Sequence, residues 1–229
     1  NTISLFYTPY MLRMMGQSEY GLYGTASSFI SYLSVLSFGI GGAYIRFNAK
    51  ARATGDRDEE RRLNGMFLIV FSVLSLLVLV VGLIFIALAG QLVKETFTLQ
   101  ELFKLRVIML ILIVNMMISF ICNVFMMALQ AYERFFFIRI VLLIAGIVQP
   151  IINVIALFLG GRSITITLVS FVVSFLSYLV MFIYARKVIH FEVLFSGFQR
   201  EVLRQIFIFS GFLFLNSVTD QITFSTDNV

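Results

Sequence analysis

The sequence has very few of the residues that build disulfides, metal centres and hydrolytic sites. Its 229 residues include one Cys, one His, two Pro and no Trp. The lone thiol, Cys122, cannot form an intrachain disulfide and is no metal site by itself, so we interpret it as a packing residue. No P-loop, His-Glu-x-x-His or Cys-x-x-Cys motif occurs. These absences argue against an enzyme, and they predict neither a metal nor an organic cofactor.

Charge is also scarce, and long stretches have none. Charged residues make up 13% of the chain and hydrophobic ones 60%, whereas soluble domains have about 25% and about 45–50%. A helix needs about 20 apolar residues to cross a bilayer. Runs without Asp, Glu, Lys, Arg or His cover residues 20–45, 63–93, 107–132, 140–161 and 163–185. The sequence therefore predicts an all-α membrane protein with several spans.

We expect six spans and the start of a seventh. Both ends look cut within a helix, so we expect a fragment of a longer protein. Residues 1–187 then form an N-terminal lobe, and 205–229 begin a C-terminal lobe with a truncated seventh helix. Between them, residues 188–204 have apolar residues at helical spacing, which predicts an amphipathic linker helix on the cytoplasmic face. The first span is the truncated 1–12, and the others are 20–45, 64–90, 107–131, 140–159 and 165–185.

Orientation follows from the basic residues, because cytoplasmic connections carry more Lys and Arg. The connections after the second, fourth and sixth spans hold Arg46, Lys50, Arg52, Arg57, Arg61, Arg62, Arg134, Arg139, Arg186, Lys187, Arg200 and Arg204. The alternate connections hold only Arg13, Lys94, Lys104, Arg106 and Arg162. We therefore expect a multi-pass protein with a cytoplasmic N-terminus. The net charge of +5 is explained by these connections rather than by a nucleic-acid partner.

Polar residues recur at helical spacing inside the spans, where they should face protein or water. Ser and Gly stripes favour close helix packing. Asn and Gln stripes fit interhelical hydrogen bonds and a cavity wall equally well. The stripes are Asn115, Ser119 and Asn123; Gly146, Gln149, Pro150 and Asn153; Ser170, Ser174 and Ser177; and Asn216, Asp220, Thr223 and Asp227.

Two acidic residues and one proline stand out within these stripes. An Asp at the centre of a membrane helix costs about 2.5–3.5 kcal/mol. We therefore interpret Asp220 and Asp227 as candidates for the transport pathway or for coupling to H⁺ or Na⁺. The alternatives are a structural salt bridge with a missing segment and, for Asp227, a position near the far membrane interface. Pro150 predicts a kink in its helix, because it removes one backbone hydrogen bond. The kink suits either a moving transporter helix or fixed packing.

Four stretches of the chain have distinctive motifs. They are TPYMLRMMG (8–16) with EYGLY (19–23); GIGGAYIRF (39–47); ARATGD (51–56) with NGMF (64–67); and FLNS (214–217) with Asp220, Gln221 and STD (225–227). These stretches resemble bacterial polysaccharide flippases of the O-antigen type. Such flippases belong to the multidrug/oligosaccharidyl-lipid/polysaccharide (MATE-like) exporter superfamily. The resemblance covers essentially the whole chain, and its departure is Ser37, where the family often has Asp.

The resemblance implies a transporter of 12–14 helices in two six-helix lobes. Such a protein carries oligosaccharide linked to undecaprenyl diphosphate across the bacterial inner membrane by alternating access. It serves the assembly of surface polysaccharide, such as the O-antigen of lipopolysaccharide, and a polymerase and glycosyltransferases are further expected partners. The anionic diphosphate needs cationic groups, for which Arg13 and Arg46 are the candidates, with topology as their alternative role. The candidates for the sugar hydroxyls are Asn115, Asn123, Gln149 and Asn153.

Two rival functions stay open. A multidrug efflux pump would have the same fold, with a more aromatic and acidic cavity. A membrane enzyme of glycan assembly would need a large extramembrane loop or clustered catalytic groups in the spans, and a structural subunit needs neither. The Asn-rich stripes and the motifs favour sugar cargo.

Overall fold

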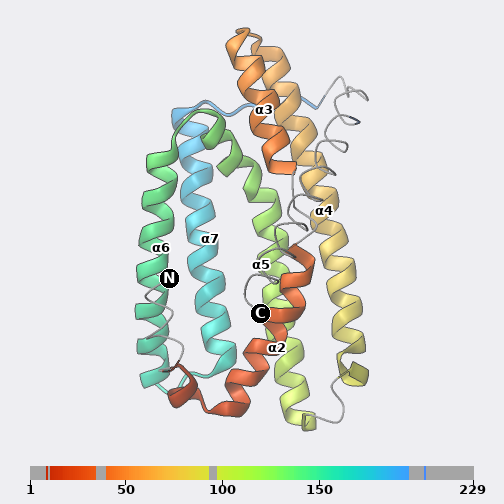
Figure 1. Ribbon diagram of the computed structural model, residues 1–229, viewed down its shortest axis with the longest axis vertical. Helices are drawn as coiled ribbons and strands as arrows, with labels where there is room; N and C mark the ends of the chain where they lie inside the picture. Colours follow the sequence, from red (N-terminus) through yellow and green to blue (C-terminus); the bar gives the residue numbers. More distant parts are fainter. Residues whose placement is uncertain (1–8, 10, 35–39, 93–96, 196–203, 205–229) are drawn as a thin grey trace, which may run out of the picture. The chain divides into compact units, whose positions relative to one another are not determined.

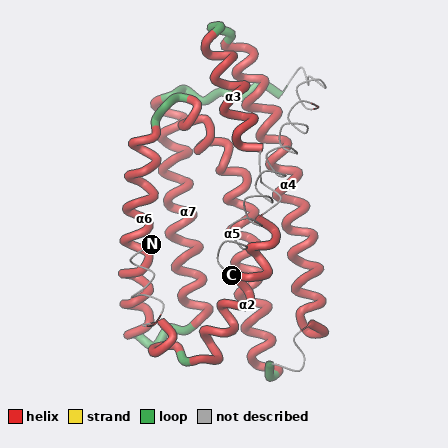
Figure 2. The backbone as a smooth tube through the Cα atoms, in the orientation of Figure 1, coloured by secondary structure: helices red, strands yellow, loops and turns green. Residues whose placement is uncertain are grey.

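The computed structural model describes residues 9, 11–34, 40–92, 97–195 and 204. These residues form helices joined by short connections, and no strand occurs among them (Figures 1 and 2). Four helices, α4 to α7, are long and apolar enough to cross a membrane. The prediction of an all-α membrane protein is therefore confirmed. The helices are α2 (Gln17–Ser34), α3 (Ile40–Ala53), α4 (Arg57–Leu92), α5 (Leu99–Ala131), α6 (Phe135–Phe158) and α7 (Ser163–Val188).

The long helices extend past the spans that the charge pattern predicts. Helix α4 has 36 residues. At 1.5 Å per residue this is about 54 Å, against a hydrocarbon core of about 30 Å. Its first turn contains Asp58, Glu59 and Glu60, and the side chain of Asp56 caps it by accepting the N–H of Glu59 at 2.9 Å. The predicted span 64–90 is thus the apolar part of a helix that begins with a charged, exposed turn.

The predicted span 20–45 corresponds to two described helices. Helix α2 ends at Ser34, and α3 runs from Ile40 to Ala53, while residues 35–39 lie outside the described part. Helix α3 also includes Lys50 and Arg52 in its last turn. Positive charges are favourable there, because the C-terminus of a helix has a partial negative charge. The predicted seventh helix, 205–229, and most of the first span, 1–12, lie outside the described residues.

Three helix ends share one backbone motif, in which a residue with positive φ ends the helix. At Gly55 (φ 74°) and Gly160 (φ 85°), glycine adopts this conformation without steric cost. Around Gly160, the N–H groups of residues 160 and 161 donate to Leu157 and Ala156 at 3.0 and 2.8 Å. Glu133 (φ 58°) takes the same position after α5. A residue with a Cβ atom is strained there.

The described contacts group the chain into two compact units. The first consists of Asn1–Leu33, Ser75–Ser119 and Arg139–Val180. Its core joins one face of α2 to α4 and α5, through Leu22, Ala89, Leu105 and Ile113 among others. Gly82 brings α4 close to α5, because a Cβ atom there would lie 2.6 Å from Cδ1 of Ile113. A smaller cluster packs Met11 and Met15 on α6 and α7 through Leu157 and Ile166.

The second unit consists of Ser34–Leu74, Phe120–Ile138 and Met181–Val229. Aromatic rings fill its core in edge-on pairs, which suit the charge distribution of aromatic rings. Tyr44 on α3 meets Phe67 on α4 at 4.9 Å between ring centroids. Phe125 on α5 meets both Phe182 on α7 and Phe191 after α7, at 4.9 and 5.0 Å.

The prediction of an amphipathic helix over 188–204 is wrong for the part that the structure describes. Helix α7 ends at Val188, and residues 189–195 are not helical. His190 adopts a positive φ of 52°, which turns the chain away from the helix axis. Ile189 and Phe191 are buried, whereas Leu194 and Phe195 are exposed, so only part of the apolar residues of this segment packs on protein. Residues 196–203 lie outside the described part.

Candidate functional site

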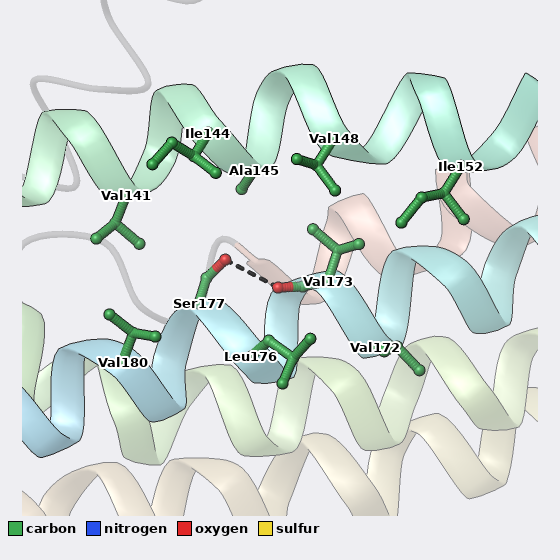
Figure 3. A pocket seen from close by; sticks show the side chains of 10 residues that line it. All are labelled: Val141, Ile144, Ala145, Val148, Ile152, Val172, Val173, Leu176, Ser177 and Val180. Carbon is green, nitrogen blue, oxygen red and sulfur yellow. Dashed lines mark hydrogen bonds between the residues drawn. The ribbon is translucent and has the colours of Figure 1, made fainter.

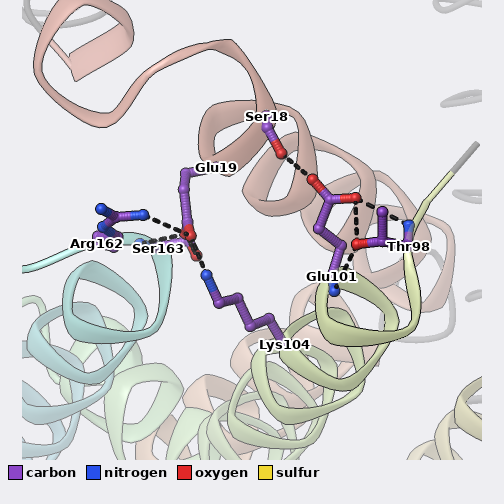
Figure 4. Close-up of polar contacts among 7 residues, drawn as sticks. All are labelled: Ser18, Glu19, Thr98, Glu101, Lys104, Arg162 and Ser163. Carbon is purple, nitrogen blue, oxygen red and sulfur yellow. Dashed lines mark hydrogen bonds and ion pairs between the residues drawn. The ribbon is translucent and has the colours of Figure 1, made fainter.

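A buried carboxylate joins three helices in the first unit. Glu19 stands in the first turn of α2 and is only 6% exposed. It forms an ion pair with Lys104 on α5 and lies 3.7 Å from Arg162, just before α7. The first residue of α7, Ser163, donates its hydroxyl and, at 3.4 Å, its N–H to the same carboxylate (Figure 4). Glu19 thus caps the N-terminus of α7, where a negative charge is favoured.

The electrostatics of this cluster keep Glu19 ionised. Burial by itself raises the pKa of Glu19, but the hydrogen bonds from Lys104 and Ser163 and the charge of Lys104 outweigh it. The net result is a pKa below the usual value. The cluster can therefore hold three helix ends together at neutral pH.

A second carboxylate lies beside the cluster and completes a capping box on α5. Thr98 donates its N–H to Glu101 at 2.9 Å, and the N–H of Glu101 donates back to the Thr98 hydroxyl at 3.4 Å. Ser18 donates its hydroxyl to the same carboxylate (Figure 4). The start of α2 is thereby tied to the start of α5 at two adjacent residues.

In the second unit, three buried polar side chains form a network between α3 and α4. The Tyr44 hydroxyl donates to Oδ1 of Asn64 at 2.7 Å. Asn48 Nδ2 donates to the same Oδ1 at 3.2 Å and to the Tyr44 oxygen at 3.3 Å. Asn64 Nδ2 donates to the backbone carbonyl of Glu192 at 2.8 Å. Tyr44, Asn48 and Asn64 are each at most 2% exposed.

A second polar group of this unit closes the C-terminal end of α5. The Arg52 guanidinium donates to the carbonyl of Ala131 and lies 3.7 Å from the ring centroid of Tyr132. The Tyr132 hydroxyl donates to Glu60 at 2.6 Å. Desolvation, together with this hydrogen bond, raises the pKa of Tyr132 to about 12. The phenol therefore stays protonated and keeps donating at physiological pH.

Two of the predicted stripes meet between α6 and α7. Gln149 Nε2 donates to the Ser170 hydroxyl at 2.8 Å. Asn153, one turn further along α6, is buried at 2% exposure. Ser177 satisfies its hydroxyl within its own helix, at 2.8 Å from the carbonyl of Val173. Gln149 therefore makes the interhelical hydrogen bond that the sequence left open as one alternative.

The stripe on α5 behaves differently. Ser119 donates its hydroxyl back to the carbonyl of Met116 at 2.7 Å. Asn115 and Asn123 are half-buried, and neither amide makes a hydrogen bond within the described part of the chain. An amide has two donors and an acceptor. These two side chains are therefore the predicted sugar-binding residues with free hydrogen-bonding capacity toward the described structure.

The remaining predicted site residues belong to different units or lie outside the described part. Arg13 is exposed in the short helical segment 11–15, and Arg46 is exposed on α3. Helix α6 continues through Pro150, which leaves the carbonyl of Gly146 without its helical donor; the kink stays a prediction. Asp220 and Asp227 lie outside the described residues.

An apolar groove lies between α6 and α7 in the first unit, with a volume of about 260 Å³. Figure 3 shows the two helices side by side, with branched side chains pointing into the groove from both. Ser177 is the one lining residue with a polar side chain, and its hydroxyl is bonded to Val173. The groove can therefore hold a hydrocarbon chain. Its walls include Val141, Ile144, Val148, Ile152, Val172, Leu176 and Val180.

The comparison with known families decides what kind of protein contains these features. The family described as polysaccharide biosynthesis protein matches residues 1–229. The chain belongs to this family. No curated protein and no solved structure matches the chain significantly. Together with helices α4 to α7, the family match makes the chain a membrane protein of polysaccharide biosynthesis.

Sequence reasoning missed the residues that carry the two buried clusters. Glu19 entered only as part of a family motif, and Lys104 and Arg162 only as orientation signals. Their common location depends on helix ends that meet in space, which no spacing along the chain reveals. Asn48 is not among the predicted site residues and Asn64 appears only in a family stretch, although a polar residue four positions after Tyr44 on one helix is a visible signal.

Proposed function

We propose that this member of the polysaccharide biosynthesis family is a flippase. It moves oligosaccharide linked to undecaprenyl diphosphate across the bacterial inner membrane by alternating access, in a MATE-like arrangement of two lobes. It acts without catalysis. The observation that carries the proposal is the family match over the whole chain, in a protein built of membrane-length helices.

The basic connections support a cytoplasmic N-terminus. Among the residues that the structure describes, the second unit holds all of the predicted cytoplasmic Lys and Arg except Arg139. Positive charge on this scale favours the cytoplasmic side of a membrane. The lightly charged connections before α5 and α7 then face the periplasm.

The proposed sugar-binding residues differ in whether their amides already have a hydrogen-bond partner in the described structure. Gln149 already has Ser170 as its partner, whereas Asn115 and Asn123 are free toward the described residues. We therefore assign the main sugar contacts to Asn115 and Asn123. Arg13 and Arg46 are proposed to meet the diphosphate, and Asp220 and Asp227 to couple transport to H⁺ or Na⁺.

The first test is a deletion of the gene. Loss of surface polysaccharide, lipid-linked units retained on the cytoplasmic side and unchanged susceptibility to cationic drugs are expected. Normal polysaccharide with increased drug susceptibility would overturn the proposal in favour of a multidrug pump.

Complementation then tests the residues. Asn115→Ala and Asn123→Ala should lower polysaccharide export at normal protein levels, because each removes hydrogen bonds to cargo. Ser119→Ala is the matched control on the same stripe, since its hydroxyl bonds to its own helix. Equal export by all three variants would refute the assignment of Asn115 and Asn123.

A further inference from the structure

Residues 189–195, here called the strap, run along the beginning of α4 within the second unit. The N–H of Leu194 donates to the carbonyl of Arg61 at 2.9 Å. Asn64 Nδ2 donates to the carbonyl of Glu192 at 2.8 Å, and Arg61 forms an ion pair with the Glu192 side chain. The strap is therefore attached to α4 through its backbone as well as through a side chain.

One glycine makes this approach possible. A Cβ atom on Gly65 would lie 2.4 Å from the carbonyl oxygen of Leu194 and 3.3 Å from Cγ1 of Val193. Such a distance to a backbone atom cannot be relieved by turning a side chain. Any other residue at position 65 therefore displaces the strap. Gly65 lies inside α4 at the point where the strap crosses. A glycine at such a position lowers the stability of the helix, but it leaves room for the strap.

The network beneath the strap contains one unused acceptor. Asn48 is 1% exposed, and its Oδ1 has no hydrogen-bond donor among the residues that the structure describes. An unpaired buried acceptor is unfavourable. The other end of the same amide is already bonded to Asn64, because Asn48 Nδ2 donates to Asn64 Oδ1 at 3.2 Å.

We propose that the part of the strap after Phe191 has a second, released position, in which Asn64 transfers its hydrogen bond from Glu192 to Asn48. In the docked position, Asn64 Nδ2 binds the strap and Asn48 Oδ1 has no donor among the described residues. In the released position, the two side-chain amides form a reciprocal pair, since the terminal torsion of Asn is soft. The bond lost to the strap is then replaced inside the network, so neither position leaves Asn64 Nδ2 unpaired.

Because of this exchange, the docked and released positions of the strap differ little in free energy, and small perturbations can change their populations. It links the chain that leaves α7 to the polar network between α3 and α4. The inference does not depend on what the protein transports, because it concerns contacts within the second unit alone.

The test uses the native protein in membranes, with Val193→Cys as the single cysteine and Cys122 replaced by Ser. Val193 is half-buried against α4, so a water-soluble maleimide reports release of the strap. Gly65→Ala should raise the labelling rate about tenfold, because the docked position is blocked. Gly146→Ala is the matched control, since a Cβ atom there meets nothing within 4 Å, and it should leave the rate unchanged.

The decisive variant is Asn48→Leu, with Asn48→Ala as the second variant in case the leucine impairs folding. Each removes both the unpaired acceptor and the alternative partner of Asn64. In the released position Asn64 Nδ2 then finds no acceptor on residue 48, so this position is less favourable. The rate of maleimide labelling should therefore fall about threefold or more. A strap that the network merely supports would be labelled faster, or at the same rate, in the Asn48 variants. That result would overturn the exchange, and an unchanged rate in Gly65→Ala would overturn docking at Leu194.

Discussion

The Glu19 cluster gives the most direct prediction about stability. The change is Glu19→Gln, which removes one negative charge and keeps the size of the side chain. The carboxylate accepts bonds from Lys104 and Ser163 and lies near Arg162. The neutral amide can retain one acceptor interaction, but it leaves two cations without their counterion. The first turn of α2 then loses its attachment to the starts of α5 and α7.

The expected loss of stability depends on how far the side chains of Lys104 and Arg162 are exposed to solvent. A hydrogen bond to a charged group contributes about 1.5–3 kcal/mol. The side chains of Lys104 and Arg162 are 35% and 69% exposed, so water and salt recover part of that loss. We expect Glu19→Gln to lower the free energy of unfolding by about 2 kcal/mol. For a domain of this size that is a fall in Tm of about 4–8 °C.

The assay is thermal unfolding of the purified native protein in one detergent. The measured quantity is the fraction of protein that remains monodisperse after heating to each temperature. Glu101→Gln is the matched control, because a Gln at this position of a capping box makes the same backbone bond. It should change the Tm little. Equal Tm values for wild type and Glu19→Gln would refute the view that the buried carboxylate holds these helices together.

The pH dependence provides a second, independent readout. The pKa of Glu19 is lower in the folded protein than its ordinary value of 4.5. Its stabilising contribution is therefore fully present above that value and is lost as the pH falls through the folded pKa. The Tm difference between wild type and Glu19→Gln should stay constant from about pH 8 to 6 and narrow below about pH 4.5. A difference that widens toward acid would contradict the assigned charge state.

Three further predictions use the same unfolding assay. Glu133→Gly should stabilise the fold by about 1 kcal/mol and Gly160→Ala should destabilise it by about 1–2 kcal/mol, because both positions require a positive φ; changes of equal sign would contradict this. Gly82→Ala should lower stability by about 1–3 kcal/mol through its contact with Ile113, whereas Gly146→Ala should not. Arg52→Lys should cost about 1 kcal/mol, because lysine cannot both stack on Tyr132 and reach the Ala131 carbonyl; an unchanged Tm would show that this end of α5 needs only a positive charge.

The uncharged runs predict the helices well, because burying charge in hydrocarbon is costly and the charged residues of α4 to α7 lie near the helix ends. The ends of the helices are less visible. Helices α4 and α5 continue into charged turns that a membrane-span criterion discards, and capping by Asp56 and Thr98 is what extends them. The strap was misjudged because its apolar residues recur at helical spacing. Phe191 is nevertheless buried against Phe125, and tertiary packing overrides the periodicity.

The candidate site was less predictable, for a physical reason. A polar residue in a membrane helix shows that some partner exists, but its sequence position does not show which partner. Gln149 and Asn115 look alike in the sequence, and only the structure separates them, because Ser170 lies within reach of the first. Glu19, Lys104 and Arg162 are far apart in the chain and come together only through the arrangement of α2, α5 and α7.

This distinction gives a general criterion for the polar residues of the chain. Interhelical hydrogen bonds in membranes are weak on average, about 0.6 kcal/mol, because an unfolded span also finds partners. A satisfied side chain such as Gln149 can therefore be replaced at small cost, and its loss should affect packing rather than transport. An amide whose donors are free toward the described residues gains nothing from packing on them, and we expect it to meet water, cargo or a part of the protein outside the described residues. Asn115 and Asn123 meet that condition among the described residues, so the strongest effect of polar substitution on transport is expected on α5 rather than on the proline-containing α6.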